Sequence, residues 1–156
     1  MNIINLIKTM ESLFGTLAAL MLLMTVGCRE QPIDLPSDNK ELALAMFDAF
    51  NKHDWKKMAS YYAENAEFLD PSLGKGYVTQ SRQEVIQKYE GMQQMFPDIT
   101  DDITAVFVSG ESVIVQFTSH GTMDNGSSFS LPIASVLTFN NGLIARDATY
   151  YDLENE

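Results

Sequence analysis

Cysteine, histidine and basic residues are all scarce in this sequence of 156 residues. Cys28 is the single cysteine, so no disulfide can form within the chain and no cysteine-based zinc site is possible. His53 and His120 are the only histidines, and no Asp-x-Asp-x-Asp-Gly loop of the calcium-binding type is present. We therefore expect neither a metal nor a cofactor.

Lysine and arginine number 10 against 21 aspartates and glutamates, which gives a formal net charge of −11. Such a surface repels nucleic acid, because contacts with phosphates require clustered Lys and Arg side chains. We therefore exclude nucleic acid as a partner. The composition is otherwise that of a globular protein, with 46% hydrophobic and 20% charged residues. A domain of this length can bury roughly two-thirds of its unfolded surface without any covalent or metal cross-link.

An apolar run near the N-terminus has about the length of the hydrophobic region of a signal peptide. It covers residues 12–27 after Lys8, and it is shorter than the ~20 residues that a membrane-spanning helix needs. Cys28 follows the run directly, within the sequence LMTVGC at 23–28. This junction resembles a bacterial lipoprotein signal, in which the cysteine becomes the lipidated N-terminus.

The resemblance implies an export segment over residues 1–27, a tether over 28–36 and a lipid anchor on Cys28. The protein would then lie in the cell envelope, outside the cytoplasm, and contact the membrane through its N-terminal lipid. The alternative is a plain signal peptide or a single membrane anchor, with Cys28 incidental.

Three helix-start signatures precede apolar residues at helical spacing. Asp38 and Glu41 form a capping box, Asp54 can cap a second, short helix, and Ser81 with Glu84 forms another capping box before a helix that stops ahead of Pro97. The expected buried stripes are Ala43, Met46, Phe47 and Phe50; Trp55, Met58, Ala59 and Tyr62; and Val85, Ile86, Tyr89, Met92 and Phe96.

Strands account for most of the remaining sequence. A short strand over 66–69 precedes a loop of breakers over 70–76, and Asn125-Gly126 is a strong hairpin signal. The longer predicted strands cover residues 99–108, 113–121, 128–139 and 143–151. This order predicts one α+β domain over residues 37–156, without repeats and without an internal linker.

The order of elements and five short landmarks resemble the NTF2-like superfamily, and in particular its SnoaL-like polyketide-cyclase branch. The landmarks are FNKHDW at 50–55, FLDP at 68–71, FPD at 96–98, NGLI at 141–144 and YYD at 150–152. The resemblance covers about residues 41–152. It implies a cone-shaped fold, in which a curved antiparallel sheet wraps around three helices and encloses a pocket. It also implies a homodimer formed through the sheet.

Ketosteroid isomerases of this superfamily allow a comparison of individual residues. Their catalytic base is the Asp of an Asp-Pro-x-Gly loop, and Asp70 nearly reproduces that loop, at the matching distance after Asp54. Their two oxyanion donors, a Tyr and a protonated Asp, fall on Met46 and Ala134, so both donors are absent. Because the loss of one such donor costs ~3–4 kcal/mol, we do not expect steroid isomerisation by that mechanism.

Three residues are candidates for acid–base catalysis, and each has a structural alternative. Asp70 could be a base whose pKa is raised by a hydrophobic pocket, or an Asp that ends a strand before a turn. His120 could pair with an Asp, as the resemblance to cyclases implies, or be a surface histidine near a hairpin. Asp147 shares a strand face with Tyr151, and the isomerase comparison favours this face as the inner one, whereas the YYD landmark draws attention to Asp152. The alternative for Asp147 is an exposed carboxylate.

Met46, Phe50, Trp55 and Tyr62 are expected to line the helix side of the pocket, with Tyr151 from the last strand, although such residues usually form core. Two functions remain open. One is a cofactor-independent acid–base enzyme of the cyclase or isomerase type, acting on an enolisable carbonyl compound. The other, which we favour because the oxyanion donors are missing and a membrane tether is present, is a lipid-anchored pocket protein that binds a small apolar molecule without catalysis.

Overall fold

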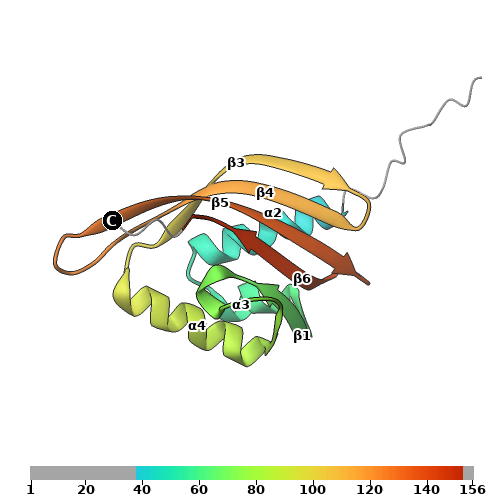
Figure 1. Cartoon of the computed structure of the whole chain (residues 1–156), viewed down its shortest axis with the longest axis horizontal. Coiled ribbons are helices and arrows are strands. Elements are labelled where there is room, and N and C mark those ends of the chain that lie inside the picture. The colour runs from blue at the N-terminus through green and yellow to red at the C-terminus, as the bar shows by residue number, and fades with distance from the viewer. Residues whose placement is uncertain (1–37, 153–156) are drawn as a thin grey trace, which may run out of the picture. The chain divides into compact units, whose positions relative to one another are not determined.

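Residues 38–152 are the part of the chain that the computed structural model describes, so the predicted segments 1–27 and 28–36 lie outside it. The described residues fold as an α+β domain, which confirms the predicted class (Figure 1). No helix among them is long and apolar enough to cross a membrane. The elements are α2 (Asp38–Asn51), α3 (Trp55–Ser60), β1 (Tyr62–Leu69), the 3-10 helix η1 (Pro71–Leu73), β2 (Val78–Ser81), α4 (Arg82–Met95), β3 (Thr100–Ser109), β4 (Ser112–Thr122), β5 (Ser128–Asn140) and β6 (Leu143–Tyr150).

Two of the predicted helix starts are confirmed by their caps. The Asp54 carboxylate accepts a hydrogen bond from the backbone N of Lys57 at the start of α3. Ser81 and Glu84 form the predicted reciprocal capping box of α4, which satisfies two backbone N–H groups at once. The capping box predicted at Asp38 depends on a side chain outside those described.

The six strands form one sheet in the order β2-β1-β6-β5-β4-β3. Every neighbouring pair is antiparallel except β1 and β6, which run parallel. The sheet is therefore mixed, which corrects the purely antiparallel sheet that the family resemblance implied. The physical reason is that the chain crosses over through β2, α4 and the meander β3–β6 before it returns beside β1.

The sequence did not predict β2, and it placed the start of β1 four residues late. β2 is a short edge strand whose residues are exposed or half-buried, so it lacks the alternation of apolar and polar residues that marks longer strands. β1 begins at Tyr62, which was expected on the face of α3, and this residue is fully buried in the strand instead.

The helices cover one face of the curved sheet, and the main core lies between them (Figure 1). On β4, Val113, Val115 and Phe117 are buried, while the residues between them are more exposed, as period-two alternation requires. The ring of Phe117 packs edge-on against Phe47 of α2 with 4.8 Å between centroids. The inward faces of β4, β5 and β6 thus form a wall opposite the helices.

Candidate functional site

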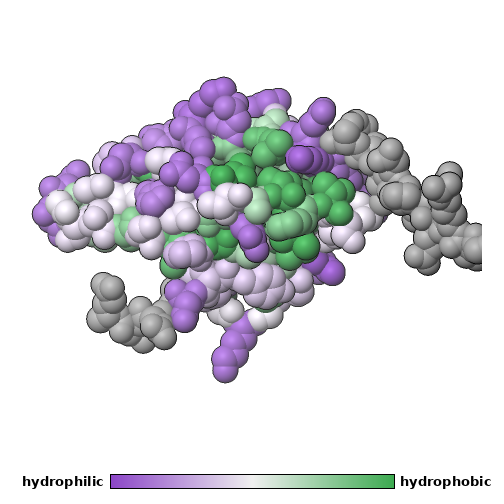
Figure 2. Space-filling view, turned by 90° about the horizontal axis from the view of Figure 1, so that it is seen from above, coloured by the Kyte–Doolittle hydropathy of each residue, from purple (hydrophilic) through white to green (hydrophobic). Residues whose placement is uncertain are grey.

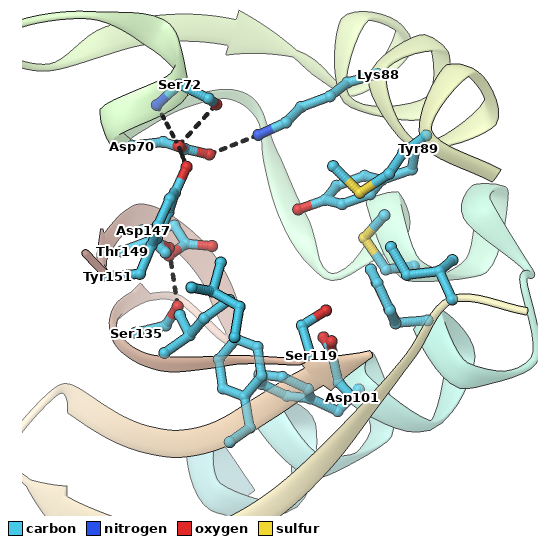
Figure 3. Close-up of a pocket in the computed structure, with 18 of the residues that line it drawn as sticks. Asp70, Ser72, Lys88, Tyr89, Asp101, Ser119, Ser135, Asp147, Thr149 and Tyr151 are labelled. Carbon is cyan, nitrogen blue, oxygen red and sulfur yellow. Dashed lines mark hydrogen bonds and ion pairs between the residues drawn. The ribbon is translucent and has the colours of Figure 1, made fainter. Parts of the chain in front are cut away.

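A cavity of about 340 Å³ lies between the sheet and the helices, within the size range of small-molecule sites (Figure 3). Most of its wall is apolar. The polar side chains gather in two places: one surrounds Asp70 and Asp147, and the other holds Asp101 and Ser119. The apolar lining comprises Met46, Phe47, Phe50, Met58, Met92, Phe96, Ile99, Phe117, Phe129, Leu131, Ile133 and Leu137.

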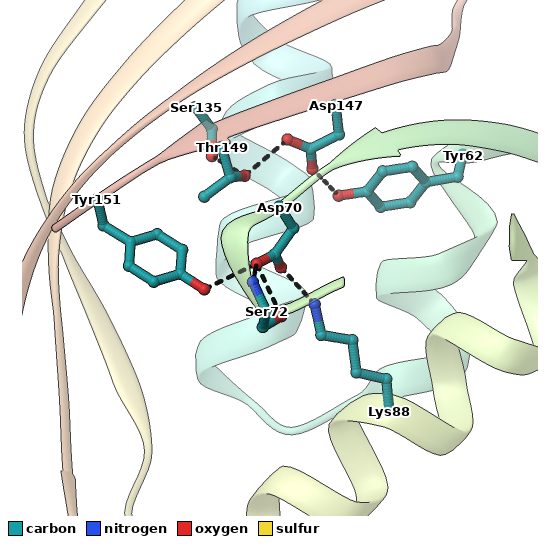
Figure 4. A network of polar contacts seen from close by, with 8 residues as sticks. All are labelled: Tyr62, Asp70, Ser72, Lys88, Ser135, Asp147, Thr149 and Tyr151. Atoms are coloured by element: carbon teal, nitrogen blue, oxygen red, sulfur yellow. Dashed lines mark hydrogen bonds and ion pairs between the residues drawn. The ribbon is translucent and has the colours of Figure 1, made fainter. Parts of the chain in front are cut away.

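Asp70 is held by four hydrogen-bond donors at the first polar position (Figure 4). Its Oδ2 accepts from the Lys88 ammonium at 2.6 Å, and its Oδ1 accepts from the Tyr151 hydroxyl at 2.7 Å. The backbone N and the hydroxyl of Ser72 also donate to Oδ1, at 2.8 and 2.7 Å, because Asp70 caps the 3-10 helix η1. Both oxygens are therefore engaged within the protein.

These contacts reverse the pKa shift that the sequence led us to expect for Asp70. Partial burial alone would raise the pKa, but the ammonium of Lys88 and the hydroxyls of Ser72 and Tyr151 outweigh it and lower the pKa to about 2. The neighbouring acidic groups in turn raise the pKa of Lys88 against the opposing effect of its burial. Asp70 is thus a stable anion and a weak base, which corrects the expectation of a raised pKa.

Asp147 is buried and faces the cavity, together with Thr149 and Tyr151, so this is the face of β6 that lines the pocket. Its Oδ2 accepts a hydrogen bond from the Tyr62 hydroxyl at 2.8 Å, and its Oδ1 accepts one from the Thr149 hydroxyl at 3.1 Å. Burial raises the pKa of Asp147, and the two hydrogen bonds offset part of that rise. This carboxyl can therefore exist in the protonated form under milder conditions than Asp70.

Asp101 occupies the second polar position and was missed in the sequence analysis. It is 6% exposed and lines the cavity from β3, opposite Ser119 of β4 in the strand register. Burial raises the pKa of Asp101 to about 7, although the Ser119 hydroxyl lowers it in part. The signal was available, because Asp101 is in phase with Ile99 and Ile103 on a strand whose alternating face points inward.

Lys88 was also missed, although it lies three residues after Val85 and four before Met92, on the apolar stripe of α4. A lysine at such a position carries its charge to the edge of the core and requires a partner, which here is Asp70. Among residues 38–152, no group of three or more His, Cys, Asp or Glu side chains is arranged to hold a metal ion.

The remaining candidates divide between the cavity and other places. Met46, Phe50, Tyr62 and Tyr151 line the cavity. Trp55 does not, because its ring is buried between His53 and Tyr89 and its Nε1 donates to Gln93 at 2.7 Å. His120 also lies outside the cavity.

The expectation that His120 lies in the cavity with Asp70 and Asp147 is wrong. Its side chain is 41% exposed, and its Nε2 lies 3.5 Å from Asp102. It alternates with Ser119, which lines the cavity from the inner face of β4, so it emerges on the outer face of the sheet. A direct acid–base pair with Asp70 or Asp147 is therefore not formed.

A family model for the SnoaL-like domain matches residues 43–147. This range contains the polar residues of the cavity lining apart from Thr149 and Tyr151. The chain belongs to the SnoaL-like domain family. No curated protein matches the chain. The matched range covers α2 from residue 43 onward, α3, α4, β1–β5 and the first five residues of β6.

Solved structures share the fold of this SnoaL-like domain at low sequence identity. The putative polyketide cyclase IdmH of Streptomyces antibioticus is 19% identical, with a TM-score of 0.64 over 73% of this chain and 91% of that one. A putative SnoaL-like polyketide cyclase from Jannaschia sp. CCS1 is 20% identical, with a TM-score of 0.64 over 81% and 92%. An NTF2-like protein of unknown function from Burkholderia pseudomallei is 21% identical, with a TM-score of 0.65 over 75% and 92%.

The ion pair of Asp70 generates a prediction about stability. Because folding lowers the pKa of Asp70 from 3.8 to about 2, its contribution is present above pH 4 and is lost as the pH falls toward 2. We expect Asp70→Asn to lower the free energy of unfolding by about 2 kcal/mol at pH 7. Urea unfolding followed by circular dichroism at several pH values would measure this difference.

Asp124→Asn is the matched control, because it removes a carboxylate from an exposed position in the turn between β4 and β5. It should leave the unfolding free energy unchanged within error. An Asp70→Asn variant as stable as the wild type at pH 7, or a difference that persists at pH 2, would contradict the assigned role of the ion pair.

Proposed function

We propose that this SnoaL-like domain binds a small, mainly apolar organic molecule in the cavity. The observation that carries the proposal is the cavity itself, which is large enough for a ligand and lined mostly by hydrophobic side chains. A ligand that buried ~200 Å² of apolar surface there would gain roughly 5 kcal/mol from removal of that surface from water. The two groups of polar side chains would then orient the ligand.

The state of Asp70 favours binding over catalysis. A general base must have a free oxygen within reach of the proton that it removes, and a pKa near the working pH. Asp70 has neither property, because its oxygens accept four hydrogen bonds and its pKa is about 2. Asp70, to which the isomerase comparison assigns the role of base, thus stabilises the structure of the pocket through its hydrogen bonds.

A second candidate function is acid–base catalysis on an enolisable carbonyl compound, without a cofactor. The observation that favours it is Asp147, a buried carboxyl with a raised pKa that faces the cavity and accepts from Tyr62. Such a group can donate or accept a proton close to a bound substrate. The solved putative polyketide cyclases support this candidate only through their shared fold.

A cavity-filling substitution tests the binding proposal. Ile133→Trp adds a large ring to a residue of β5 that lines the cavity, whereas Ser130→Trp adds the same ring to an exposed position of the same strand. We expect the neutral fluorophore N-phenyl-1-naphthylamine to bind the wild type and Ser130→Trp, and to lose at least about tenfold in affinity for Ile133→Trp. Fluorescence titration measures all three.

Equal binding to the three proteins would place the probe outside the cavity and argue against the proposal. The second candidate function has a separate readout. Exchange of the α-protons of 2-tetralone for deuterium, catalysed by the wild type and abolished in Asp147→Asn, would establish proton transfer; an unchanged background rate would leave binding alone.

We also propose that the domain is held at the membrane of the cell envelope through a lipid on Cys28. The support is the LMTVGC sequence, which places the chain's single cysteine directly after an apolar run. The residues between Cys28 and the start of α2 include Pro32 and Pro36 and suit a short tether. The pocket would then act on molecules outside the cytoplasm.

Substitution of the cysteine tests the anchor. We expect Cys28→Ser to move the protein from the membrane fraction to the soluble fraction after cell lysis and to abolish incorporation of radiolabelled palmitate, because the acceptor thiol is gone. Thr25→Ser, which keeps the cysteine, should behave as the wild type. Label incorporation into Cys28→Ser would refute this assignment.

A homodimer through the outer face of the sheet is our third proposal. Register places Phe107 beside Ile114, Ile114 beside Val136, and Val136 beside Ala148, so an apolar row crosses β3 to β6 on that face. Phe107 is 54% exposed, although it is a large aromatic residue. Figure 2, which views the molecule from the sheet side, has hydrophobic residues gathered over part of this surface.

Charge placed within this row should separate the subunits. We expect Ile114→Lys to shift the protein from dimer to monomer in sedimentation equilibrium, because an ammonium would be buried without a partner at the interface. Thr118→Lys, on the same strand and face but outside the row, should remain dimeric. A wild type that is monomeric at all concentrations would rule out the dimer.

A further inference from the structure

Asp101 has one carboxylate oxygen that finds no hydrogen-bond partner among the described residues. The residue is 6% exposed, and Oδ1 is the unpartnered atom. Figure 3 shows the carboxyl directed into the cavity beside Ser119. A buried acceptor without a partner costs free energy, so evolution would retain such a group only where something else compensates for the cost.

The backbone of Asp101 is fixed by a side chain of α2. The Asn51 amide donates to the carbonyl oxygen of Asp101 at 2.9 Å, and its oxygen accepts from the backbone N of Asp101 at 2.8 Å. These two hydrogen bonds hold the start of β3 against the end of α2. Because both the backbone N–H and the carbonyl of Asp101 are hydrogen-bonded, the carboxyl extends into the cavity from a fixed backbone position.

The cavity carries more acidic than basic groups. Asp70, Asp101 and Asp147 all line it, and Lys88, the single basic residue in its lining, is paired with Asp70. Asp147 is stabilised by two hydroxyl donors, whereas the unpartnered Oδ1 of Asp101 has neither a donor nor a cation in contact. The Ser119 hydroxyl lowers the pKa of Asp101 only in part, and no cation of the cavity lining neutralises Asp101 when it is ionised.

Aromatic residues line the same cavity as Asp101. Phe117 lies two residues before Ser119 on the inner face of β4, and Phe47 packs against it. Tyr89 and Phe50 line the cavity from the helices, with their ring centroids 5.4 Å apart. Aromatic rings attract organic cations, and the Asp101 carboxylate adds a negative charge to the same cavity.

We propose that Asp101 anchors the protonated nitrogen of a small organic amine whose apolar body fills the cavity. A neutral donor such as an alcohol could form the missing hydrogen bond, but it would leave the carboxylate charge uncompensated in an apolar environment. An ammonium group supplies both the donor and the charge. This inference rests on the proposed binding function and specifies the class of ligand.

Proton release upon binding follows from the same geometry. Asp101 raises the pKa values of Tyr62 and Tyr89, while Ser119 lowers and Asp102 raises the pKa of Asp101 itself. Lys88, the basic residue of the cavity lining, is paired with Asp70, so no basic side chain of the lining is paired with Asp101. In the free protein burial raises the pKa of Asp101 to about 7, and a bound ammonium must lower it. Amine binding at pH 6 should therefore release a proton, and the affinity should rise as the pH increases toward 8.

The test compares 2-phenylethylamine with its neutral counterpart 2-phenylethanol on the full-length protein. Isothermal titration calorimetry should give at least about tenfold tighter binding of the amine to the wild type at pH 8. Asp101→Asn should lose this preference and still bind the alcohol with unchanged affinity. Asp102→Asn removes the adjacent carboxylate, which is 75% exposed, and should keep the preference.

Titration at pH 6 in two buffers with different ionisation enthalpies counts the released proton, and Asp101→Asn should release none. Equal affinity for amine and alcohol, retention of the preference in Asp101→Asn, or failure of both compounds to bind would each overturn the amine assignment. N-phenyl-1-naphthylamine then distinguishes the two proposals. If it still binds in the cavity, only the amine assignment fails. If it does not bind, the proposed binding function fails as well.

Discussion

The parallel pairing of β1 with β6 determines where the polar side of the cavity forms. Phe68 lies beside Asp147 and Leu69 beside Ala148, so the chain leaves β1 next to the last residues of β6. Asp70 then comes within reach of the Tyr151 hydroxyl, although 81 residues separate the two in the sequence. The remaining donors, Ser72 and Lys88, follow from the turn after β1 and from the helix that covers it.

Three carboxyls in one cavity behave differently because their surroundings differ. Asp70 has an ammonium and three other donors and remains ionised; Asp147 is deeply buried with two hydroxyl donors; Asp101 is buried with one oxygen unmatched. Desolvation acts on all three, and the number and charge of the donors decide the outcome. Asp70 therefore has a structural role in the cavity wall. Asp101 and Asp147 can change their protonation state when a ligand enters the cavity.

The sequence predicted those features that depend on neighbours along the chain. The capping box at Ser81, the buried stripe of α2 and the grouping of Asp147 with Tyr151 on one strand face rest on local spacing and agree with the structure. That this face points inward came from the comparison with the isomerases, and the structure confirms it. The prediction failed where distant residues decide. The pKa of Asp70 depends on Lys88 and Tyr151, the direction of β1 depends on a crossover, and the edge strand β2 has no buried face to produce a pattern.

The two walls of the cavity differ in how easily they can change shape. Met46, Met58 and Met92 project from three different helices, and unbranched thioether chains can adopt several rotamers at little cost. The opposite wall consists of paired strands, whose side chains are held in register. Movement of the methionine side chains alone could therefore let the cavity accept ligands of different shapes. Asp101 and Asp147 stay at a constant spacing on the sheet, so they would select among these ligands by the positions of their heteroatoms.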